Sequence, residues 1–211
     1  MAGFTYYVKI FIALLVLVNP LEGIPFFLQG TSKSDSNIQA AVARRAGIAV
    51  AAILLIAALF GSGMLRVFGV SIGAFQIGGG VVLFLIAIRM VLSYSNPAPV
   101  QTPDDSTGMA FAIVPLAIPL LAGPGAIAGA ILYGTRMRSI GEMAILAGII
   151  VLVSVTAYAS LRGADILAKY LKDTGISVVT SIMGLIITAI AIEMIGHGLN
   201  LMFGLKIFNS Y

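Results

Sequence analysis

Long apolar stretches without charge constrain this chain more than any other feature. Six of them follow one another, and within the first stretch Glu22 is the only charged residue. Each approaches or exceeds the ~20 residues that an α-helix needs to cross ~30 Å of hydrocarbon. The stretches are 10–32, 46–65, 67–88, 106–135, 143–161 and 174–192.

The composition leaves a bilayer as the natural environment of these stretches. Only 9% of the residues are charged and the mean hydropathy is +1.09, whereas soluble domains carry about 25% charged residues. In hydrocarbon each backbone polar group must be satisfied within the protein, which favours helices. We therefore predict an all-α integral membrane bundle of six transmembrane helices, with spans near 8–29, 44–66, 71–93, 109–133, 141–162 and 178–203.

The two halves of the chain resemble each other. An offset of 104 residues carries Gly80 onto Gly184 and Asn19-Pro20 onto Gly123-Pro124. This predicts a first three-helix repeat at 1–94, a polar connecting loop at 95–108 and a second three-helix repeat at 109–211. Because each repeat has three spans, the second must enter the membrane from the opposite side, as in inverted-repeat transporters. The alternative is chance similarity among apolar helices.

Helix breakers lie inside the first span of each repeat. Pro20, Pro25 and Pro124 lack the N–H that a continuous helix needs. Gly23, and Gly125 in the second repeat, let the backbone leave helical geometry at little cost. Two breaks at matching positions predict a shared polar cavity near the midplane, where half-helix N-termini attract a carboxylate and freed carbonyls an ammonium group or a cation. The alternative is that the prolines only kink helices for packing. The expected substrate-binding residues are Asn19, Pro20, Glu22, Gly23, Pro25, Gln76, Gly123, Pro124 and Gly125.

Ionisable residues inside the spans are candidates for proton or ion coupling. Glu22 lies within the first break, and a carboxylate there is costly unless it is paired, hydrated or protonated. Glu193, His197 and Asn200 follow at helical spacing on one face of the last span, and histidine titrates near neutral pH. We name Glu22, Glu193 and His197 as the coupling candidates. One alternative places Glu22 at the aqueous end of its span. The other places Glu193, His197 and Asn200 on a polar interfacial face near the end of the last span.

Other classes of function find little support in the sequence. Cysteine is absent and His197 is the one histidine, so we expect no metal and no cofactor. An intramembrane enzyme would need a nucleophile paired with a base, or a metal cluster, and we expect none. The basic residues are scattered among the loops, which favours a topological role over nucleic-acid binding.

Several motifs stand out along essentially the whole chain. They are Asn19-Pro20 with 23–25, the run 115–127, Gly134-Thr135-Arg136 and the segments 175–177 and 182–184. Together they resemble the motifs of the MarC family, also described as the neutral amino acid transporter (SnatA-like) family of the lysine-exporter superfamily. The resemblance implies transport of small neutral amino acids such as glycine, alanine or serine.

The leading hypothesis is a secondary transporter of these amino acids, driven by the substrate gradient or by H⁺ or Na⁺. A channel or carrier for an inorganic ion is the alternative. We expect a multi-pass protein of the cell inner (plasma) membrane. Seven basic residues against five give a slight preference for both termini outside. Flat Gly/Ala faces permit a homodimer without requiring one.

Overall fold

A computed structural model describes residues 3–31, 34–92 and 112–204. The described part is all-helical, as predicted, and contains no strand. The predicted connecting loop 95–108 lies outside the described residues. The elements are α1 (Phe4–Val18), α2 (Pro20–Gly30), α3 (Ser36–Val67), α4 (Ile72–Leu92), η1 (Ala112–Leu121), α6 (Pro124–Arg136), α7 (Ile140–Arg162) and α8 (Ala164–Phe203).

Five of the six predicted spans correspond to described segments long and apolar enough to cross a membrane. They are Phe4–Leu28, Ser36–Val67, Ile72–Leu92, Ile140–Arg162 and Ser181–Phe203. The predicted span 109–133 is divided instead into η1 and α6, each too short to cross alone. η1 is a π-helix that contains Pro115 and Pro119, and the backbone N–H of Ala122 donates to the carbonyl of Ala117 at 2.8 Å, five residues back.

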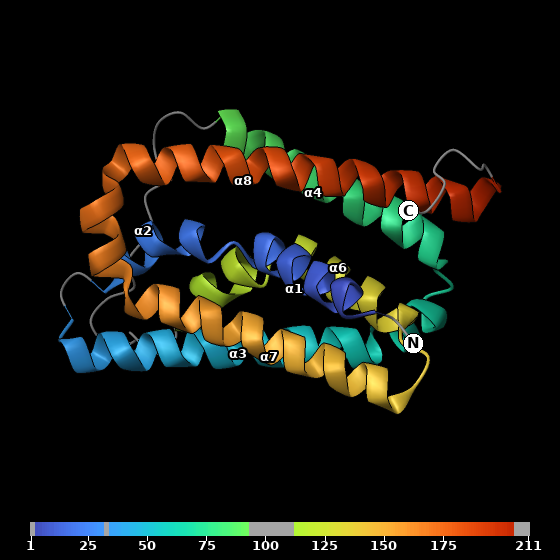
Figure 1. Cartoon of the computed structure of the whole chain (residues 1–211), viewed down its shortest axis with the longest axis horizontal. Coiled ribbons are helices and arrows are strands. Elements are labelled where there is room, and N and C mark those ends of the chain that lie inside the picture. Colours follow the sequence, from blue (N-terminus) through green and yellow to red (C-terminus); the bar gives the residue numbers. More distant parts are fainter. Residues whose placement is uncertain (1–2, 32–33, 93–111, 205–211) are drawn as a thin grey trace.

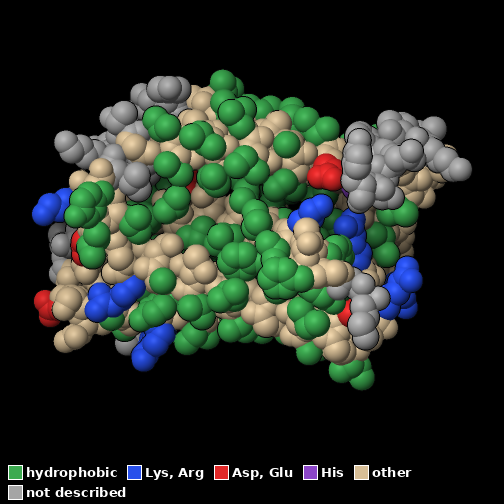
Figure 2. Space-filling model, in the orientation of Figure 1, with side chains coloured by type: hydrophobic (Ala, Val, Ile, Leu, Met, Phe, Trp, Pro, Cys, Tyr) green, Lys and Arg blue, Asp and Glu red, His purple; other side chains and the backbone are tan. Residues whose placement is uncertain are grey.

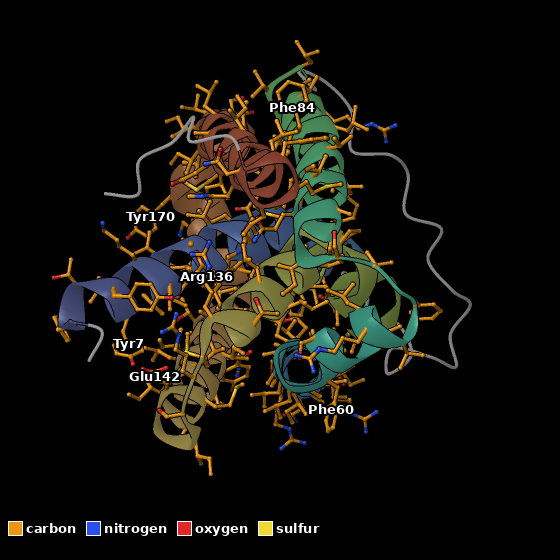
Figure 3. All side chains as sticks on the ribbon, turned by 90° about the vertical axis from the view of Figure 1, so that its right-hand side faces the viewer. Tyr7, Phe60, Phe84, Arg136, Glu142 and Tyr170 are labelled. Atoms are coloured by element: carbon orange, nitrogen blue, oxygen red, sulfur yellow. The ribbon has the colours of Figure 1, made fainter. Side chains whose placement is uncertain are left out.

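The helices form three layers of two (Figures 1 and 3). α4 and α8 make the first layer, the broken pair α1–α2 and η1–α6 makes the middle layer, and α3 and α7 make the third. The two members of the middle layer run in opposite directions along the bundle (Figure 1). Both breaks therefore lie in the middle layer, where neighbouring helices can supply hydrogen-bond partners to irregular backbone; Asn19 is buried and Gly123 is half-buried.

Two pairs of helices in the two halves begin at corresponding residues. α2 begins at Pro20 and α6 at Pro124, and α3 begins at Ser36 and α7 at Ile140. Both pairs are 104 residues apart, which is the offset found in the sequence. The offset of 104 residues therefore relates the starts of helices as well as single residues of the sequence.

Small residues bring α4 and α8 into close contact, and the contact is reciprocal. A Cβ atom at Gly80 would lie 2.8 Å from the carbonyl oxygen of Ala191, and one at Gly184 would lie 3.1 Å from that of Ala87. The offset of 104 residues carries Gly80 onto Gly184 and Ala87 onto Ala191, so each contact is the repeat equivalent of the other. A two-fold relation between two helices produces such a pair of contacts. Close approach through glycine is also the usual way for membrane helices to pack.

The buried apolar residues divide into two clusters. The larger one joins the middle layer to α3 and α7 through side chains such as Leu14, Leu54, Leu116 and Ile150. The smaller one joins α4 and α8 to α6 and contains Leu83, Ala87, Met90, Ala128, Leu132, Ile187, Ala191 and Met194. The α4–α8 layer thus rests on the remainder of the protein through a smaller core.

The surface has the pattern of a membrane protein. Charged side chains gather toward the two ends of the visible face, and hydrophobic side chains dominate the region between them (Figure 2). Large apolar side chains such as Ile56, Phe60, Leu85 and Leu185 are at least 58% exposed, which only a lipid environment makes favourable. α1 starts and α8 finishes at the same end of the bundle (Figure 1).

The α4–α8 contact can be tested with two neighbouring glycines. In Gly80→Ala the new methyl group would lie 2.6 Å from Cγ1 of Ile195 as well as 2.8 Å from the Ala191 carbonyl. We expect a loss of about 1–3 kcal/mol in stability from overpacking. In the control Gly78→Ala the methyl group meets nothing within 4 Å, and alanine is the better helix former. Thermal unfolding in detergent, followed by circular dichroism, should rank Gly78→Ala at or above wild type; equal stability of both variants would contradict the contact.

Candidate functional site

The first helix break is concentrated in one residue, Asn19. Its backbone is left-handed, with φ 41° and ψ 67°, and in the described part it is the only non-glycine residue with positive φ. Its N–H donates to the carbonyl of Leu15 at 2.9 Å, and its carbonyl accepts from the N–H of Glu22 at 3.1 Å. Asn19 thus ends α1 and begins α2. Asparagine tolerates this conformation better than most residues do.

The side chain of Asn19 is buried and holds Glu22. Nδ2 of Asn19 donates to Oε2 of Glu22 at 3.1 Å, and Asn19 is only 5% exposed. Glu22 lies in the first turn of α2, where the positive end of the helix dipole stabilises a carboxylate. The pair occupies the two positions of a capping box, but here the side chains bond each other, and the Glu22 N–H donates to the backbone carbonyl of Asn19.

Two residues expected to disrupt this segment do not do so. α2 continues through Pro25. Gly23 was expected to let the backbone leave helical geometry, and this is wrong because Gly23 is helical. A Cβ atom there would lie 3.0 Å from Cδ2 of Leu121, so Gly23 is needed for close packing against the end of η1.

The second break also consists of a non-helical residue followed by a proline that begins a new helix. Gly123 is extended, with φ −72° and ψ 174°, and Pro124 is the first residue of α6. Ile127 donates its N–H to the carbonyl of Gly123 at 3.0 Å. Proline suits the first helical position because its missing N–H would have no partner there. A Cβ atom at Gly125 would overlap the side chain of Leu83, so this glycine also permits close packing.

Both half-helices start with a proline part-way along the bundle; Pro20 is buried, whereas Pro124 is exposed and Gly123 before it is half-buried. α2 starts at Pro20, after left-handed Asn19, and α6 starts at Pro124, after extended Gly123. The first N–H groups of a helix have no partner within it, and they carry the positive end of its dipole. The breaks can thus offer hydrogen-bond donors to an anionic group.

A cavity of about 330 Å³ lies away from the breaks, at the end of the bundle where α4 begins and where α6 and α8 finish. Figure 3 looks onto this end and shows Arg136 near its centre, whereas Phe60 and Phe84 lie toward the periphery. We call this cavity the vestibule. Its lining residues are Ile72, Gln76, Leu132, Thr135, Arg136, His197, Asn200 and Leu201.

The polar groups of the vestibule come from three helices. Gln76 of α4 is 2% exposed, and its Oε1 atom has no hydrogen-bond partner. From α6, the Thr135 hydroxyl donates to the carbonyl of Leu132 at 2.7 Å, and Cζ of Arg136 lies 5.9 Å from the centre of the Tyr133 ring. From α8, Nε2 of His197 lies 3.9 Å from Oε1 of Glu193.

The structure separates the residues that the sequence grouped together. Among the nine expected substrate-binding residues, Gln76 alone lines the vestibule, and the others lie at the breaks. Among the coupling candidates, His197 lines the vestibule beside Glu193, and Glu22 lies at the first break. A second cavity, of about 470 Å³, adjoins the vestibule and is lined by Ser71, Ile72, Gly73, Leu201 and Met202.

Thr135 and Arg136 were not among the expected site residues. They appeared only in the run Gly134-Thr135-Arg136, which contributed to the family resemblance. Arg136 was counted with the loop cations, and the sequence gives no sign that α4 and α8 meet the end of α6. In the described part, no three His, Cys, Asp or Glu side chains are placed to hold a metal ion.

Packed side chains lie between the vestibule and the second break. Leu83 contacts the position of Gly125 at the break, and Leu132 lines the vestibule. Both belong to the smaller apolar cluster, together with Ala128 and Met194. A Cβ atom at Gly79 would lie 3.0 Å from Cε of Met194 and 3.1 Å from Cβ of Ala128. The route along α6 is therefore closed in this conformation.

Comparison with known proteins shows the family of the chain. The profile described as MarC family integral membrane protein matches residues 4–203. The chain belongs to the MarC family. It is 37% identical over 199 residues to UPF0056 membrane protein YhcE of Escherichia coli, covering 93% of each chain. It is also 34% identical over 197 residues to UPF0056 membrane protein MJ1677 of Methanocaldococcus jannaschii, covering 92% of this chain and 96% of the relative.

The family is also represented in Bacillus subtilis. UPF0056 membrane protein YvbG of that organism is 31% identical over 205 residues, covering 95% of this chain and 97% of the relative. No solved structure matches the chain. The comparisons thus establish an integral membrane protein of the MarC type, and the resemblance read from the sequence motifs is confirmed.

The backbone at Asn19 gives a prediction about the first break. Asn19→Gly keeps a residue that adopts positive φ freely, although it loses the bond to Glu22. Asn19→Leu loses the same bond and adds about 1–2 kcal/mol for the left-handed conformation. Thermal unfolding in detergent should therefore rank wild type first, Asn19→Gly second and Asn19→Leu last. A leucine variant as stable as the glycine variant would contradict the left-handed break.

Proposed function

We propose that this MarC family protein is a secondary transporter of small neutral amino acids such as glycine, alanine or serine, working by alternating access. The observation that carries the proposal is the pair of breaks at Asn19 and Gly123, 104 residues apart, each followed by a half-helix that begins with proline. A structural scaffold gains nothing from such breaks. Transporters use discontinuous helices to bind substrate near the membrane midplane.

An inverted repeat of three plus three spans underlies this mechanism in our proposal. In it, η1 and α6 together form the sixth crossing segment, equivalent to α1 and α2. Three features support the repeat: the shared offset of helix starts, the reciprocal contacts Gly80–Ala191 and Gly184–Ala87, and the opposite directions of the two broken segments (Figure 1). Inverted repeats let one half adopt the other's conformation, which exchanges access between the two sides.

The chemistry at the breaks suits a zwitterion. The N-termini of α2 and α6 supply N–H groups and positive dipole ends for a carboxylate. The Glu22 carboxylate, held by Asn19, supplies an acceptor for an ammonium group or a coupling H⁺ or Na⁺. Leu121 against Gly23 and Leu83 against Gly125 leave little room beside the breaks, which favours the smallest amino acids.

The moving part in this proposal is the α4–α8 layer. Reciprocal glycine contacts bind α4 to α8, while a smaller apolar cluster joins the layer to the rest of the bundle. Displacing this layer would part Leu83 from Gly125 and open the route from the vestibule to the second break. We place the protein in the plasma membrane with both termini outside; the arrangement of α1 and α8 puts the two ends of the described chain on one side.

Uptake of radiolabelled glycine, alanine and serine into proteoliposomes of the purified protein tests the function. We expect uptake above that of protein-free liposomes, and accumulation when the coupling gradient of H⁺ or Na⁺ is imposed. If Glu22 carries the coupling ion, Glu22→Gln should retain exchange of substrate down its own gradient and lose gradient-driven accumulation. Absence of flux for glycine, alanine and serine in a folded, inserted sample would reject the proposal, and conductance of an inorganic ion in that sample would favour the alternative.

The packing at the second break gives a further prediction, with a compensating variant. Gly125→Ala should lower uptake because its methyl group overlaps the side chain of Leu83. Gly125→Ala combined with Leu83→Ala removes the overlapping atoms and should recover part of the uptake lost in the single variant. Leu83→Ala alone is the control. A double variant no better than Gly125→Ala would show that the glycine acts in some way other than by admitting Leu83.

A further inference from the structure

The vestibule contains the positive charge of Arg136, and the carboxylate of Glu193 lies beside His197 in the same region. Arg136 stacks near the Tyr133 ring, and within the described part of the chain no Asp or Glu oxygen lies within ion-pair distance of its guanidinium group. Arginine keeps its charge in any protein environment, and its planar group suits bidentate binding of a carboxylate. The cavity therefore presents a cation prepared for an anionic group.

The same cavity contains a buried acceptor without a donor. Oε1 of Gln76 has no hydrogen-bond partner, and the residue is 2% exposed. A buried polar atom left unpaired costs stability, so its presence in a cavity wall points to a donor supplied from outside. Thr135 adds a second acceptor, because its hydroxyl hydrogen is already given to the Leu132 carbonyl.

The end of α6 strengthens the acceptor side. α6 finishes at Arg136, so its last carbonyl groups and the negative end of its dipole lie at the vestibule. These groups favour a cation. The vestibule thus combines hydrogen-bond donors for an anion with hydrogen-bond acceptors for a cation. The side chains of Ile72, Leu132 and Leu201 form the apolar part of its wall.

We propose that the vestibule is a binding site for the zwitterion of a small α-amino acid, separate from the helix breaks. Arg136 holds the carboxylate, while Oε1 of Gln76, the Thr135 hydroxyl and the C-terminal end of α6 receive the ammonium group. The volume of about 330 Å³ admits such a molecule and lies at the lower end of the range for small-molecule pockets. The inference rests on the proposed function and adds to it a first site, at the mouth of the protein.

The vestibule and the second break are the two ends of one helix. α6 has 13 residues, so its ends are about 18 Å apart at ~1.5 Å per residue. In the conformation described, the cluster containing Leu83 and Met194 lies along this route. A molecule held at Arg136 would thus wait outside the packed cluster until the α4–α8 layer moves.

Binding to the purified protein in lipid-free detergent tests the site with three probes. Glycine carries both charges, glycinamide lacks the carboxylate, and propionate lacks the ammonium group. Isothermal titration calorimetry should show glycine binding more tightly than either analogue. Arg136→Gln should weaken glycine binding by about tenfold to a hundredfold, the range for losing a hydrogen bond to a charged group.

Arg138→Gln is the matched control for the loss of one positive charge. Arg138 lies two residues away and, like Arg136, is exposed, but it does not line the vestibule. Its backbone N–H, which the substitution retains, donates to Oε2 of Glu142 at 2.8 Å. We expect wild-type glycine binding from this variant. An equal loss in Arg136→Gln and Arg138→Gln would overturn the site, because the effect would then be one of net charge.

Gln76→Leu gives an independent test that does not depend on charge. Removing an unpaired buried acceptor should raise the thermal stability of the ligand-free protein. It should also abolish the preference for glycine over propionate, because the ammonium group loses its acceptor. A Gln76→Leu variant that is less stable and still prefers glycine would overturn the role of Gln76.

The remaining outcomes separate this inference from the proposed function. If the wild-type protein takes up glycine and the Arg136→Gln variant binds and takes up glycine equally well, the vestibule site is overturned and the transport function stands. If the wild-type protein takes up neither glycine, alanine nor serine, the proposed function and this inference are both overturned. Stabilisation by phosphatidylethanolamine, whose headgroup also joins an anion to an ammonium group, without stabilisation by glycine would assign the vestibule to lipid and overturn the amino acid site.

Discussion

The requirement that every backbone polar group find a partner inside hydrocarbon governs this structure. Continuous helices meet it easily, so each departure from a helix needs an explanation. The two breaks solve the problem economically: proline takes the first position of each new half-helix, where an N–H would have no partner anyway. Asn19 meets the requirement further by ending one helix, starting the next and holding Glu22.

Close contact between helices is the second requirement, since the hydrophobic effect does not hold helices together in lipid. Glycine residues allow this close contact at several helix interfaces. Gly134 lets α6 approach the backbone of Ala58 in α3, Gly73 and Gly198 bring α4 and α8 together, and Gly23 admits Leu121. The three-layer arrangement follows from these contacts, with the broken helices enclosed between two layers of continuous ones.

Much of the fold could be predicted from the sequence because lipid imposes a simple rule on length and charge. Five spans and the break within the predicted span 109–133 follow from apolar stretches and proline positions, and the offset of 104 residues reappears in the starts of two pairs of helices. Glycines were harder to interpret. Gly23 and Gly125 looked like sources of backbone freedom, yet both are helical and packed against leucine side chains, a property that depends on a distant partner.

The vestibule was beyond sequence reasoning for the same reason. Gln76 and His197 were singled out as polar residues in apolar spans, but Arg136 looked like an ordinary cation at the end of a span. Its importance depends on the meeting of α4, α6 and α8 at one end of the bundle. Tertiary contacts of this kind leave no trace in local composition.

The vestibule lies at one end of the bundle, where α4 begins and where α6 and α8 finish. The offset of 104 residues carries its Thr135 onto Thr31, and both hydroxyls donate to a backbone carbonyl at 2.7 Å. A carrier that binds substrate at one of its ends before the central site would half-saturate at different substrate concentrations on its two sides. Its equilibrium would be unaffected, because a binding site changes occupancy and rate while the gradients alone fix the final distribution.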